Sequence, residues 1–377
     1  MLRLGIAGTG AMAAYQVRKF RAMDGCQISA CVDRNPGNAA DFALRFGIPR
    51  HYSSITDLLD AGCCQAVSCV TSDSQHARIV LAALERGLPV FCEKPLARTL
   101  PECQAMADLA ARAGVPNLVN FSKRNAPALA GLKAMVESGE LGELVAVEAE
   151  YLQSWVLTKA WGDWLSTPRW RWRLLPGESS AGVAGDLGSH LVDALLYLFG
   201  DLVPTGEARS VNLAQALAQV LAQEADGGQA LAADGRQAPA ADGGQAPIPG
   251  EFLAGSGPVC VTFSASAVLP GGAPVRLRAS WIESGALDDF MIVVHGSRGK
   301  AILDFGRSRS AVAWYADASE PVTMVEGPQT PSTYQRFVEL ASRQRPMGAG
   351  GEDGLDFAQA LRTQRLLDSL VPGGLPR

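Results

Sequence analysis

The stretch LRLGIAGTGAMA at residues 2–13 places two glycines between an apolar strand and the start of a helix. Here Gly8 permits the tight turn after the strand, Gly10 lets the backbone approach a pyrophosphate, and Ala13 lets helix and strand pack closely. The first N–H groups of the helix lack partners within it and can donate to phosphate oxygens. The stretch therefore predicts a dinucleotide-binding loop, with contacts from Gly8, Thr9, Gly10, Ala11 and Met12.

A carboxylate follows the second predicted strand, Gln27–Val32, and an arginine comes next. Asp33 is placed to accept hydrogen bonds from the adenosine ribose hydroxyls and to repel a 2′-phosphate, whereas Arg34 favours such a phosphate. We therefore expect NAD as the cofactor, in contact with Asp33 and Arg34, and NADP as the alternative. A domain of the same fold that binds no cofactor is the other reading.

Short apolar strands alternate with helical stretches through the first 120 residues. Such alternation is typical of a parallel sheet that is covered by helices on both faces. We expect an α/β domain, a doubly wound Rossmann sheet, over residues 1–122. The predicted strands are Leu2–Ala7, Gln27–Val32, Ala66–Val70, Pro89–Cys92 and Asn117–Asn120, and the helices between them include Gln75–Arg86 and Leu100–Ala113.

The pattern changes after residue 140, where longer alternating strands such as Leu144–Val156 appear. Strands that flank short glycine-containing turns predict hairpins, and hence an α+β domain with a large, mostly antiparallel open sheet over residues 123–377. We expect helices on one face and, through the other, a homo-oligomer (dimer or tetramer). The paired strands are Val259–Val268 with Val275–Ile282 and Phe290–His295 with Lys300–Phe305; the helices are Pro127–Ser138, Ser189–Phe199, Pro331–Arg343 and Gly354–Leu370.

A low-complexity segment interrupts this domain at about residues 214–257. Around Asp226, Asp234 and Asp242 the motif Ala-Asp-Gly-Gly/Arg-Gln-Ala recurs with a spacing of eight. Because Ala, Gly, Gln and Pro bury little apolar area, we expect a flexible insertion. A calcium-binding glycine-aspartate repeat is the alternative, although the acidic residues lack supporting apolar positions.

Composition and charge narrow the class of protein. Of 377 residues, 47% are hydrophobic and 19% charged, and the net charge of −5 argues against a nucleic-acid partner. Met1 leads directly into a strand and no apolar run is long enough to span a bilayer, so we expect a cytoplasmic protein without a membrane partner. The eight cysteines contain no C-x-x-C pair and the four histidines are scattered, so we expect buried free thiols and no metal site.

Four further motifs carry a resemblance to a known family. They are VTSDSQH at residues 70–76, GLPVFCEKPL at 87–96, FSKR at 121–124 and GVAGDLGSHLVD at 182–193. With these motifs the chain resembles the Gfo/Idh/MocA family over nearly its whole length outside the insertion. The resemblance implies an NAD(P)-dependent oxidoreductase that transfers hydride between the nicotinamide and a secondary alcohol or ketone of a sugar, cyclitol or related polyol.

The resemblance also implies a set of site residues. Lys94 and His190 are the implied catalytic pair, and Asp186 assists them. The chemistry agrees, because alcohol oxidation needs a base for the hydroxyl proton and imidazole has a suitable pKa. The alternative reading is Asp186 as a helix cap and His190 as a core histidine. The implied nucleotide contacts are Thr71, Ser72, His76, Glu93 and Lys94, and the implied substrate contacts are Lys94, Arg124, Trp172, Asp186 and His190.

The substrate pocket is less well specified. The family's usual Gly-Gly-Gly and Asn-Arg-Arg-Phe motifs are here GVAG at 182–185 and SKRN at 122–125. We expect glycines 182, 185 and 188 to let ligands approach the backbone. A tryptophan cluster offers aromatic faces for stacking on a sugar ring, with core packing as the alternative; its members are Trp155, Trp161, Trp164, Trp170 and Trp172.

Two other functions stay open at this point. One is an enzyme of the same family that cleaves glycosidic bonds with transient use of NAD. The other is a non-catalytic nucleotide-binding sensor, which would not need the acid–base groups Lys94, Asp186 and His190.

Overall fold

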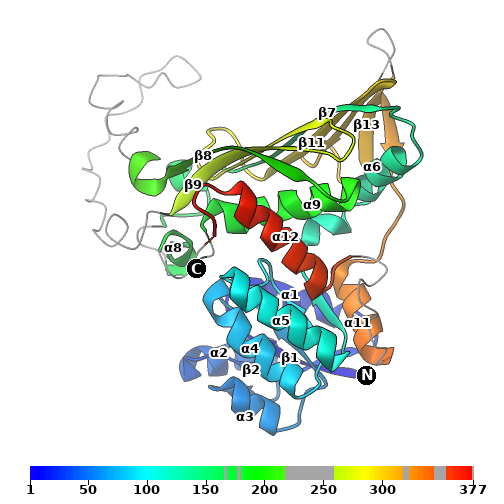
Figure 1. Cartoon of the computed structure of the whole chain (residues 1–377). Helices are drawn as coiled ribbons and strands as arrows, with labels where there is room; N and C mark the ends of the chain where they lie inside the picture. The colour runs from blue at the N-terminus through cyan, green and yellow to red at the C-terminus, as the bar shows by residue number, and fades with distance from the viewer. Residues whose placement is uncertain are drawn as a thin grey trace, which may run out of the picture.

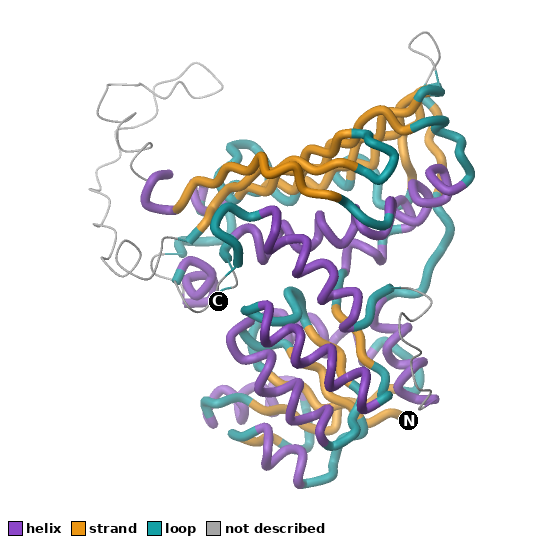
Figure 2. Tube along the Cα trace, viewed as in Figure 1, coloured by secondary structure: helices purple, strands orange, loops and turns teal. Residues whose placement is uncertain are grey.

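The computed structural model describes residues 1–164, 168–175, 179, 181–216, 259–316, 322–343 and 354–375. The predicted insertion, with its repeat, lies outside the described residues except for residues 214–216. The described chain forms two sheets in separate layers with helices between them (Figures 1 and 2). None of the described helices is both long and apolar enough to cross a membrane.

The N-terminal sheet is the parallel sheet that the sequence predicts. Among the described residues, six strands lie in the order β3-β2-β1-β4-β5-β6, and each neighbouring pair is parallel. The chain order reverses between β1 and β4, and sheets of this kind bind ligands at the carboxyl ends of the strands beside the reversal. The strands are β1 (Leu2–Ala7), β2 (Cys26–Val32), β3 (His51–Tyr52), β4 (Ala66–Cys69), β5 (Val90–Cys92) and β6 (Asn117–Val119).

Helices connect these strands, and local sequence explains where they begin and end. Before α5, Thr99 and Glu102 bond reciprocally in a capping box, which satisfies backbone N–H groups at the helix start. The same helix ends at Gly114, whose φ of +62° suits glycine. The helices are α1 (Ala11–Arg21), α2 (Pro36–Phe46), α3 (Ile55–Asp60), α4 (Asp73–Glu85) and α5 (Leu100–Ala113), the last with the predicted bounds.

The second sheet is mostly antiparallel, as predicted. Its eight described strands lie in the order β14-β13-β12-β11-β7-β10-β9-β8, and β7 and β10 are parallel neighbours. Both predicted hairpins are present, as β9–β10 and β11–β12. The strands are β7 (Leu144–Leu152), β8 (Val203–Asn212), β9 (Cys260–Val268), β10 (Pro274–Ser280), β11 (Asp289–Gly296), β12 (Gly299–Asp304), β13 (Ala311–Tyr315) and β14 (Thr323–Glu326).

The strand predicted over 144–156 was too long. It ends at Leu152, because Trp155 and Val156 bury their side chains from a short helix instead. The apolar sequence continues across this change, so alternation alone did not mark it.

Helices fill the layer between the two sheets. In Figure 1, α6, α9 and α12 run beneath the second sheet and face the N-terminal domain. Nearly all of α9 is buried, as its apolar sequence requires. Assembly through the opposite face of the sheet stays a prediction. The helices of this part are α6 (Pro127–Glu137), α7 (Trp155–Thr158), α8 (Pro168–Arg171), α9 (Ser189–Phe199), α11 (Thr333–Arg343) and α12 (Phe357–Leu370).

The C-terminal part of the chain returns to the N-terminal sheet. Tyr334 and Phe337 of α11 pack against Phe20 and Phe91, with ring centroids 5.1–6.3 Å apart. Phe357, at the start of α12, is fully buried in the same core. The core of the N-terminal half is therefore completed by residues far along the chain, while the predicted domain boundary at residue 122 stays a prediction.

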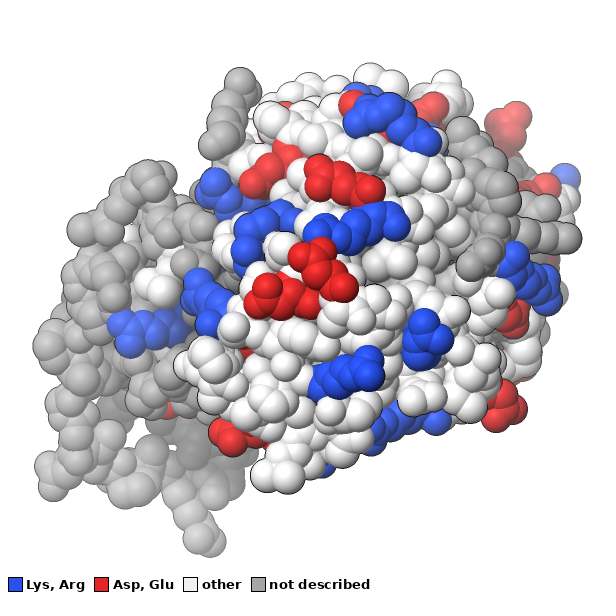
Figure 3. Space-filling model, turned by 90° about the horizontal axis from the view of Figure 1, so that it is seen from below, with Lys and Arg blue, Asp and Glu red and all other residues white. Residues whose placement is uncertain are grey.

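Charges of both signs are mixed on the face seen from below. Figure 3 shows basic and acidic side chains beside one another across the described surface. A surface of this kind produces little long-range steering of a strongly charged partner toward this face.

Candidate functional site

A cleft of about 1440 Å³ lies between the carboxyl edge of the N-terminal sheet and the helices beneath the second sheet. The residues that line it come from both halves of the chain. Most predicted site residues are among them: Gly8, Thr9, Gly10, Ala11, Met12, Asp33, Arg34, Thr71, Ser72, Glu93, Lys94, Trp172, Asp186 and His190.

The glycine loop has the shape that a phosphate site needs. Gly8 has a φ of +109°, and a Cβ there would lie 2.7 Å from the carbonyl oxygen of Val70. A Cβ on Gly10 would meet no described atom within 4 Å, so the space in front of it is open. Ala13 is fully buried where α1 meets the sheet. The loop thus leaves room for a phosphate at the N-terminus of α1.

The carboxylate of Asp33 is fixed beside this loop. Its Oδ2 accepts a hydrogen bond from Thr9 Oγ1 at 2.6 Å, and its Oδ1 accepts one from the Asn35 N–H at 2.9 Å. Each oxygen keeps a lone pair that can accept from a ribose hydroxyl. Arg34, the other predicted contact after β2, also lines the cleft.

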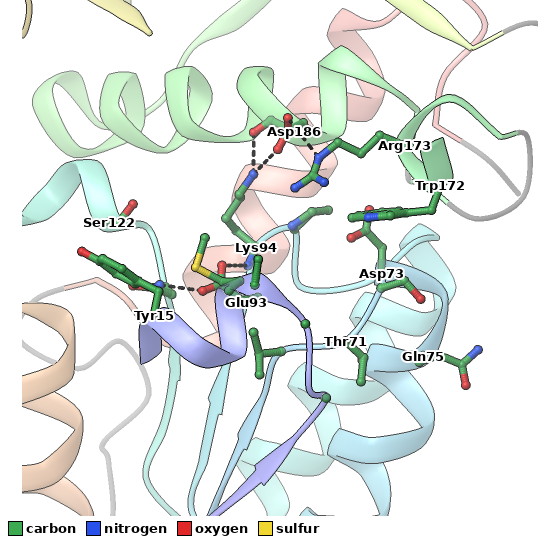
Figure 4. Close-up of a pocket in the computed structure, with 18 of the residues that line it drawn as sticks. Tyr15, Thr71, Asp73, Gln75, Glu93, Lys94, Ser122, Trp172, Arg173 and Asp186 are labelled. Atoms are coloured by element: carbon green, nitrogen blue, oxygen red, sulfur yellow. Dashed lines mark hydrogen bonds and ion pairs between the residues drawn. The ribbon is translucent and has the colours of Figure 1, made fainter. Parts of the chain in front are cut away.

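Lys94 bridges the two halves of the cleft. From the loop after β5, its Nζ donates to Asp186 Oδ1 at 2.5 Å and to the Asp186 carbonyl oxygen at 2.9 Å (Figure 4). Arg173 Nε lies 3.7 Å from the other carboxylate oxygen. Burial alone would raise the pKa of Asp186, but Lys94 and Arg173 hold that pKa well below its usual range. Asp186 therefore stays ionised and anchors the ammonium group.

Asp186 and His190 enter the cleft from an irregular helix start. A π-helical turn, Ala184–Gly188, precedes α9, and such turns occur frequently at functional sites. A Cβ on Gly182 would lie 2.3 Å from the Cys260 carbonyl oxygen, and one on Gly188 would lie 2.8 Å from the Phe263 ring. Packing against β9 therefore requires glycine at these two positions, and Gly182 also lines the cleft. Ligand approach to these glycines stays a prediction.

His190 is an imidazole held neutral. The side chain is buried, with its ring 6.2 Å from the Phe121 ring and 6.0 Å from the Tyr151 ring between centroids. Burial, then the charges of Lys94 and Lys123, lower its pKa well below 6.5, against the opposing effect of Asp186. Nδ1 is buried and has no hydrogen-bond partner among the described residues. A neutral ring at the edge of the cleft can accept a proton.

Glu93 forms hydrogen bonds that hold the loop carrying Lys94 in place. Its Oε1 accepts hydrogen bonds from Gln16 Nε2 at 2.6 Å and from Asn120 Nδ2 at 2.7 Å. Its Oε2 accepts from the Lys94 N–H at 3.3 Å. Glu93 lines the cleft as predicted, but these contacts mainly hold together α1, β6 and the loop that carries Lys94.

Lys123 and Asp288 form a second charged pair in the cleft. Lys123 Nζ lies 3.2 Å from Asp288 Oδ2 and 4.3 Å from the centroid of the Tyr151 ring. Asp288 Oδ1 also accepts from the Tyr151 hydroxyl at 2.6 Å and from Gln153 Nε2 at 2.9 Å. Sequence reasoning missed all four residues. Asp288 gave no signal, because it lies in a connecting loop that the fold alone brings to the site.

The tryptophan cluster divides between core and cleft. Trp155 and Trp164 are buried in the core, which confirms the packing alternative for these two. Trp161 and Trp170 line the cleft together with Trp172 and with Trp281, which was not predicted. Arg173 lies over the Trp172 ring, 4.5 Å from its centroid. Figure 4 shows Trp172 and Arg173 on the same side of the cleft.

The prediction that Arg124 contacts substrate is wrong. Its side chain is buried away from the cleft and pairs with Asp193, with Nε to Oδ2 and Nη2 to Oδ1 both at 2.7 Å. A single 3₁₀ turn over residues 122–125 explains the error. In such a turn adjacent side chains point about 120° apart, so Lys123 faces the cleft while Arg124 faces the core.

His76 does not line the cleft either, although it was predicted as a nucleotide contact. It is fully buried behind Thr71. Its Nε2 lies 3.2 Å from the Thr71 carbonyl oxygen, and its Nδ1 lies 3.0 Å from that of Pro95 and 3.3 Å from that of Leu96. His76 therefore ties together the two loops that follow β4 and β5.

The fold and this cleft define a protein with a Rossmann-type parallel sheet, a second, mostly antiparallel sheet, and a cluster of ionisable side chains in the cleft. Residues 2–121 match the family model described as "Oxidoreductase family, NAD-binding Rossmann fold". Residues 129–302 match the model described as "GFO/IDH/MocA C-terminal domain". The chain belongs to the GFO/IDH/MocA family of oxidoreductases, and its N-terminal domain is an NAD-binding Rossmann domain.

Curated relatives include sugar and cyclitol dehydrogenases. The chain is 33% identical to a levoglucosan dehydrogenase from Pseudarthrobacter phenanthrenivorans, over 45% of this chain and 42% of the relative. It is 33% identical to an inositol 2-dehydrogenase from Leifsonia xyli, over 42% and 49%. It is 27% identical to a glucose-6-phosphate 3-dehydrogenase from Bacillus subtilis, over 53% and 54%. The matches thus span about half the length of these relatives.

Solved structures share the whole fold. A levoglucosan dehydrogenase in complex with NADH and levoglucosan superposes with a TM-score of 0.73, at 22% identity over 98% of this chain and 95% of that chain. An inositol dehydrogenase homologue from Azotobacter vinelandii in complex with NAD⁺ superposes with a TM-score of 0.74, at 19% identity over 98% and 94%. Both comparisons show that the two-sheet architecture is common to these proteins.

Proposed function

We propose that this chain is an NAD-dependent dehydrogenase that oxidises a secondary alcohol of a sugar, cyclitol or related polyol, or reduces the matching ketone. The observation that carries the proposal is that His190 and Lys94 line one cleft, with the Lys94 ammonium group held by Asp186. Two relatives are named levoglucosan dehydrogenase and inositol 2-dehydrogenase, and these names support the proposed substrate class.

The open space at Gly10 and the fixed carboxylate of Asp33 fit the diphosphate and ribose of NAD. When bound, NAD supplies the hydride acceptor. His190 takes the proton of the substrate hydroxyl at Nε2, because Nδ1 is buried. Lys94 donates a hydrogen bond to the same substrate oxygen and stabilises the negative charge that develops on it. Asp186 keeps Lys94 in place, so little reorganisation accompanies the reaction.

A substrate scan tests this proposal. Sugars, inositols and their glycosides are incubated with NAD⁺, and NADH is followed by its absorbance. We expect NADH with at least one cyclic polyol or sugar. Cleavage of a glycoside without net NADH would replace the proposal with a transient use of the cofactor, and binding of NAD without turnover of any substrate would favour a sensor.

We expect the Asp33→Asn variant to lose its preference for NAD. Wild type should bind NAD more tightly than NADP, because the Asp33 carboxylate repels a 2′-phosphate. Asparagine removes this charge and keeps the side-chain shape. The ratio of the Kd for NADP to the Kd for NAD should therefore fall by about tenfold, or about 1.4 kcal/mol. Calorimetric titration with both cofactors measures it, with Asp41→Asn on α2, outside the cleft, as the control. If wild type bound NAD and NADP equally well, the predicted preference for NAD would be wrong.

We expect the Lys123→Met variant to shift the pH profile. The groups whose charges act on His190 are Lys94, Lys123 and Asp186. A nearby cation disfavours the protonated ring, so losing Lys123 raises the pKa of His190 and moves the acidic limb of kcat/KM to higher pH. Asp288 keeps Tyr151 and Gln153 as donors. Lys300→Met is the control, because Lys300 lies on β12 outside the cleft, and it should leave the acidic limb in place. If the limb does not move in the Lys123 variant either, His190 is not the group that titrates there.

A further inference from the structure

Two cysteines lie side by side directly behind the cleft. Cys69 and Cys92 are register partners at the carboxyl ends of β4 and β5, and neither is exposed to solvent. Register partners on neighbouring strands point to the same face of the sheet, and such strands lie about 4.8 Å apart. This separation falls within the Cα distance range, about 4.4–6.8 Å, over which a disulfide can form. The two sulfur atoms already lie within 4.8 Å of each other.

His76 completes the cluster and gives it charge. Both of its ring nitrogens face backbone carbonyl oxygens, Nε2 that of Thr71 and Nδ1 those of Pro95 and Leu96. Carbonyl oxygens only accept, so both nitrogens must carry a proton to satisfy these contacts, and the ring is then an imidazolium. A metal ligand needs a free nitrogen lone pair. The arrangement therefore favours a charged histidine over a metal site, although the three ligand atoms lie close together.

A buried cation requires nearby negative charge, and Cys69 is placed to supply it together with Asp73. Burial alone would raise the pKa of Cys69, but a hydrogen bond from Cys92, the charge of His76 and contacts with Thr71 lower it to about 6. Burial and the same sulfur contact raise the pKa of Cys92 well above its usual value. These shifts favour the thiolate at Cys69 and the protonated thiol at Cys92.

We propose that Cys69 and Cys92 form a reversible, peroxide-driven disulfide that switches off the adjacent cofactor site. The Cys69 thiolate attacks one oxygen of hydrogen peroxide, the O–O bond breaks, and Cys69 becomes a sulfenic acid as hydroxide leaves. Cys92 then attacks the Cys69 sulfur, the S–S bond forms, the S–O bond breaks, and water leaves. The two thiols lose two electrons, which reduce the peroxide to water.

The cleft gives a short route to the reacting sulfur. Thr71 lines the cleft, and its Oγ1 lies 3.7 Å from Cys69 Sγ. Through this contact the buried Cys69 sulfur lies one side chain away from the cleft that would hold NAD. Bound NAD should therefore slow the reaction by covering Thr71.

Disulfide formation would also disturb the site. Thr71 and Lys94 each follow one of the cysteines by two residues, and both line the cleft. Oxidation removes the thiolate that offsets the charge of His76, and His76 contacts the loops after both strands. We therefore expect the loops that carry Thr71 and Lys94 to shift. We expect weaker NAD binding and, if the proposed dehydrogenase activity holds, lower turnover as well.

Peptide mapping of the full chain after treatment with hydrogen peroxide tests the inference without reference to activity. We expect a peptide that links Cys69 to Cys92, restored to thiols by dithiothreitol, and slower linkage when NAD is present. Cys69→Ser should prevent it, and Cys92→Ser should leave a sulfenic acid that dimedone traps. Cys103→Ser is the control, because Cys103 is buried in α5 and its pKa is raised to about 12; its linkage should match that of wild type.

The folded wild-type protein alone suffices to refute the proposal. Circular dichroism confirms that the treated chain stays folded. No Cys69–Cys92 peptide under conditions that oxidise a surface thiol, or a linkage that appears only after unfolding, would overturn it. Linkage with unchanged NAD affinity would overturn the switch. Loss of NADH formation is a separate readout, so a failure of the proposed enzymatic function leaves the mapping result interpretable.

Discussion

Replacing either His190 or Lys94 by alanine is expected to lower kcat by about 10²–10⁴-fold, the usual effect of losing a general acid or base. In the proposed reaction His190 accepts the hydroxyl proton, and Lys94, which Asp186 holds in place, binds the oxygen from which the proton leaves. NAD affinity should change far less, because the glycine loop and Asp33 lie elsewhere in the cleft. Steady-state kinetics and calorimetric NAD titration separate the two effects.

The double variant tests whether the two residues act together. Groups that act on one proton fail together, so the combined loss should be smaller than the product of the single losses. His51→Ala is a matched control, because His51 is exposed on β3 and should leave kcat unchanged. A folded His190→Ala protein that binds NAD and keeps near-normal turnover would show that His190 is a core histidine instead.

Replacing Arg124 by alanine is expected to reduce the free energy of unfolding by about 3–5 kcal/mol. Arg124 and Asp193 form a two-bond ion pair in which their side chains are 6% and 2% exposed. Removing one partner leaves the other charge buried without compensation, which is far more costly than losing the attraction alone. Burial already raises the pKa of Asp193 despite the opposing effect of Arg124. Urea denaturation followed by circular dichroism measures the change.

Two comparisons make this prediction specific. The double variant Arg124→Met, Asp193→Leu should recover much of the stability, because neither charge is then left buried. Arg362→Ala removes an exposed pair with Asp201, whose side chains are 50% and 79% exposed, and should change stability by about 1 kcal/mol or less. A loss for Arg124→Ala no larger than that for Arg362→Ala would contradict the argument.

The N-terminal half was predictable because its signals are local. The glycine loop, the following helix and the carboxylate at Asp33 stand close together in the sequence, and each reflects a backbone or ligand requirement of one βαβ unit. The hairpins of the second sheet were predictable for the same reason, since their turns contain glycine. Lys94, Asp186 and His190 were implied by resemblance, and the structure brings all three to the cleft.

The sequence did not reveal the direction in which neighbouring side chains point, nor the contacts between residues that lie far apart in the chain. Residues 122–125 contain adjacent basic side chains, and only the 3₁₀ turn decides that Lys123 and not Arg124 faces the cleft. Asp288 comes from a loop without a recognisable pattern. Cys69, His76 and Cys92 have no spacing typical of a cluster, because neighbouring parallel strands bring them together.

The aromatic contacts between the two ends of the chain have a consequence during protein synthesis. Phe20 and Phe91 pack against Tyr334 and Phe337, and Phe357 completes the same core. A ribosome that has translated the first half has therefore released a Rossmann sheet with part of its apolar surface still uncovered. That surface stays open to aggregation or chaperone binding until α11 and α12 leave the exit tunnel, so this domain reaches its final stability only after these two helices have been translated.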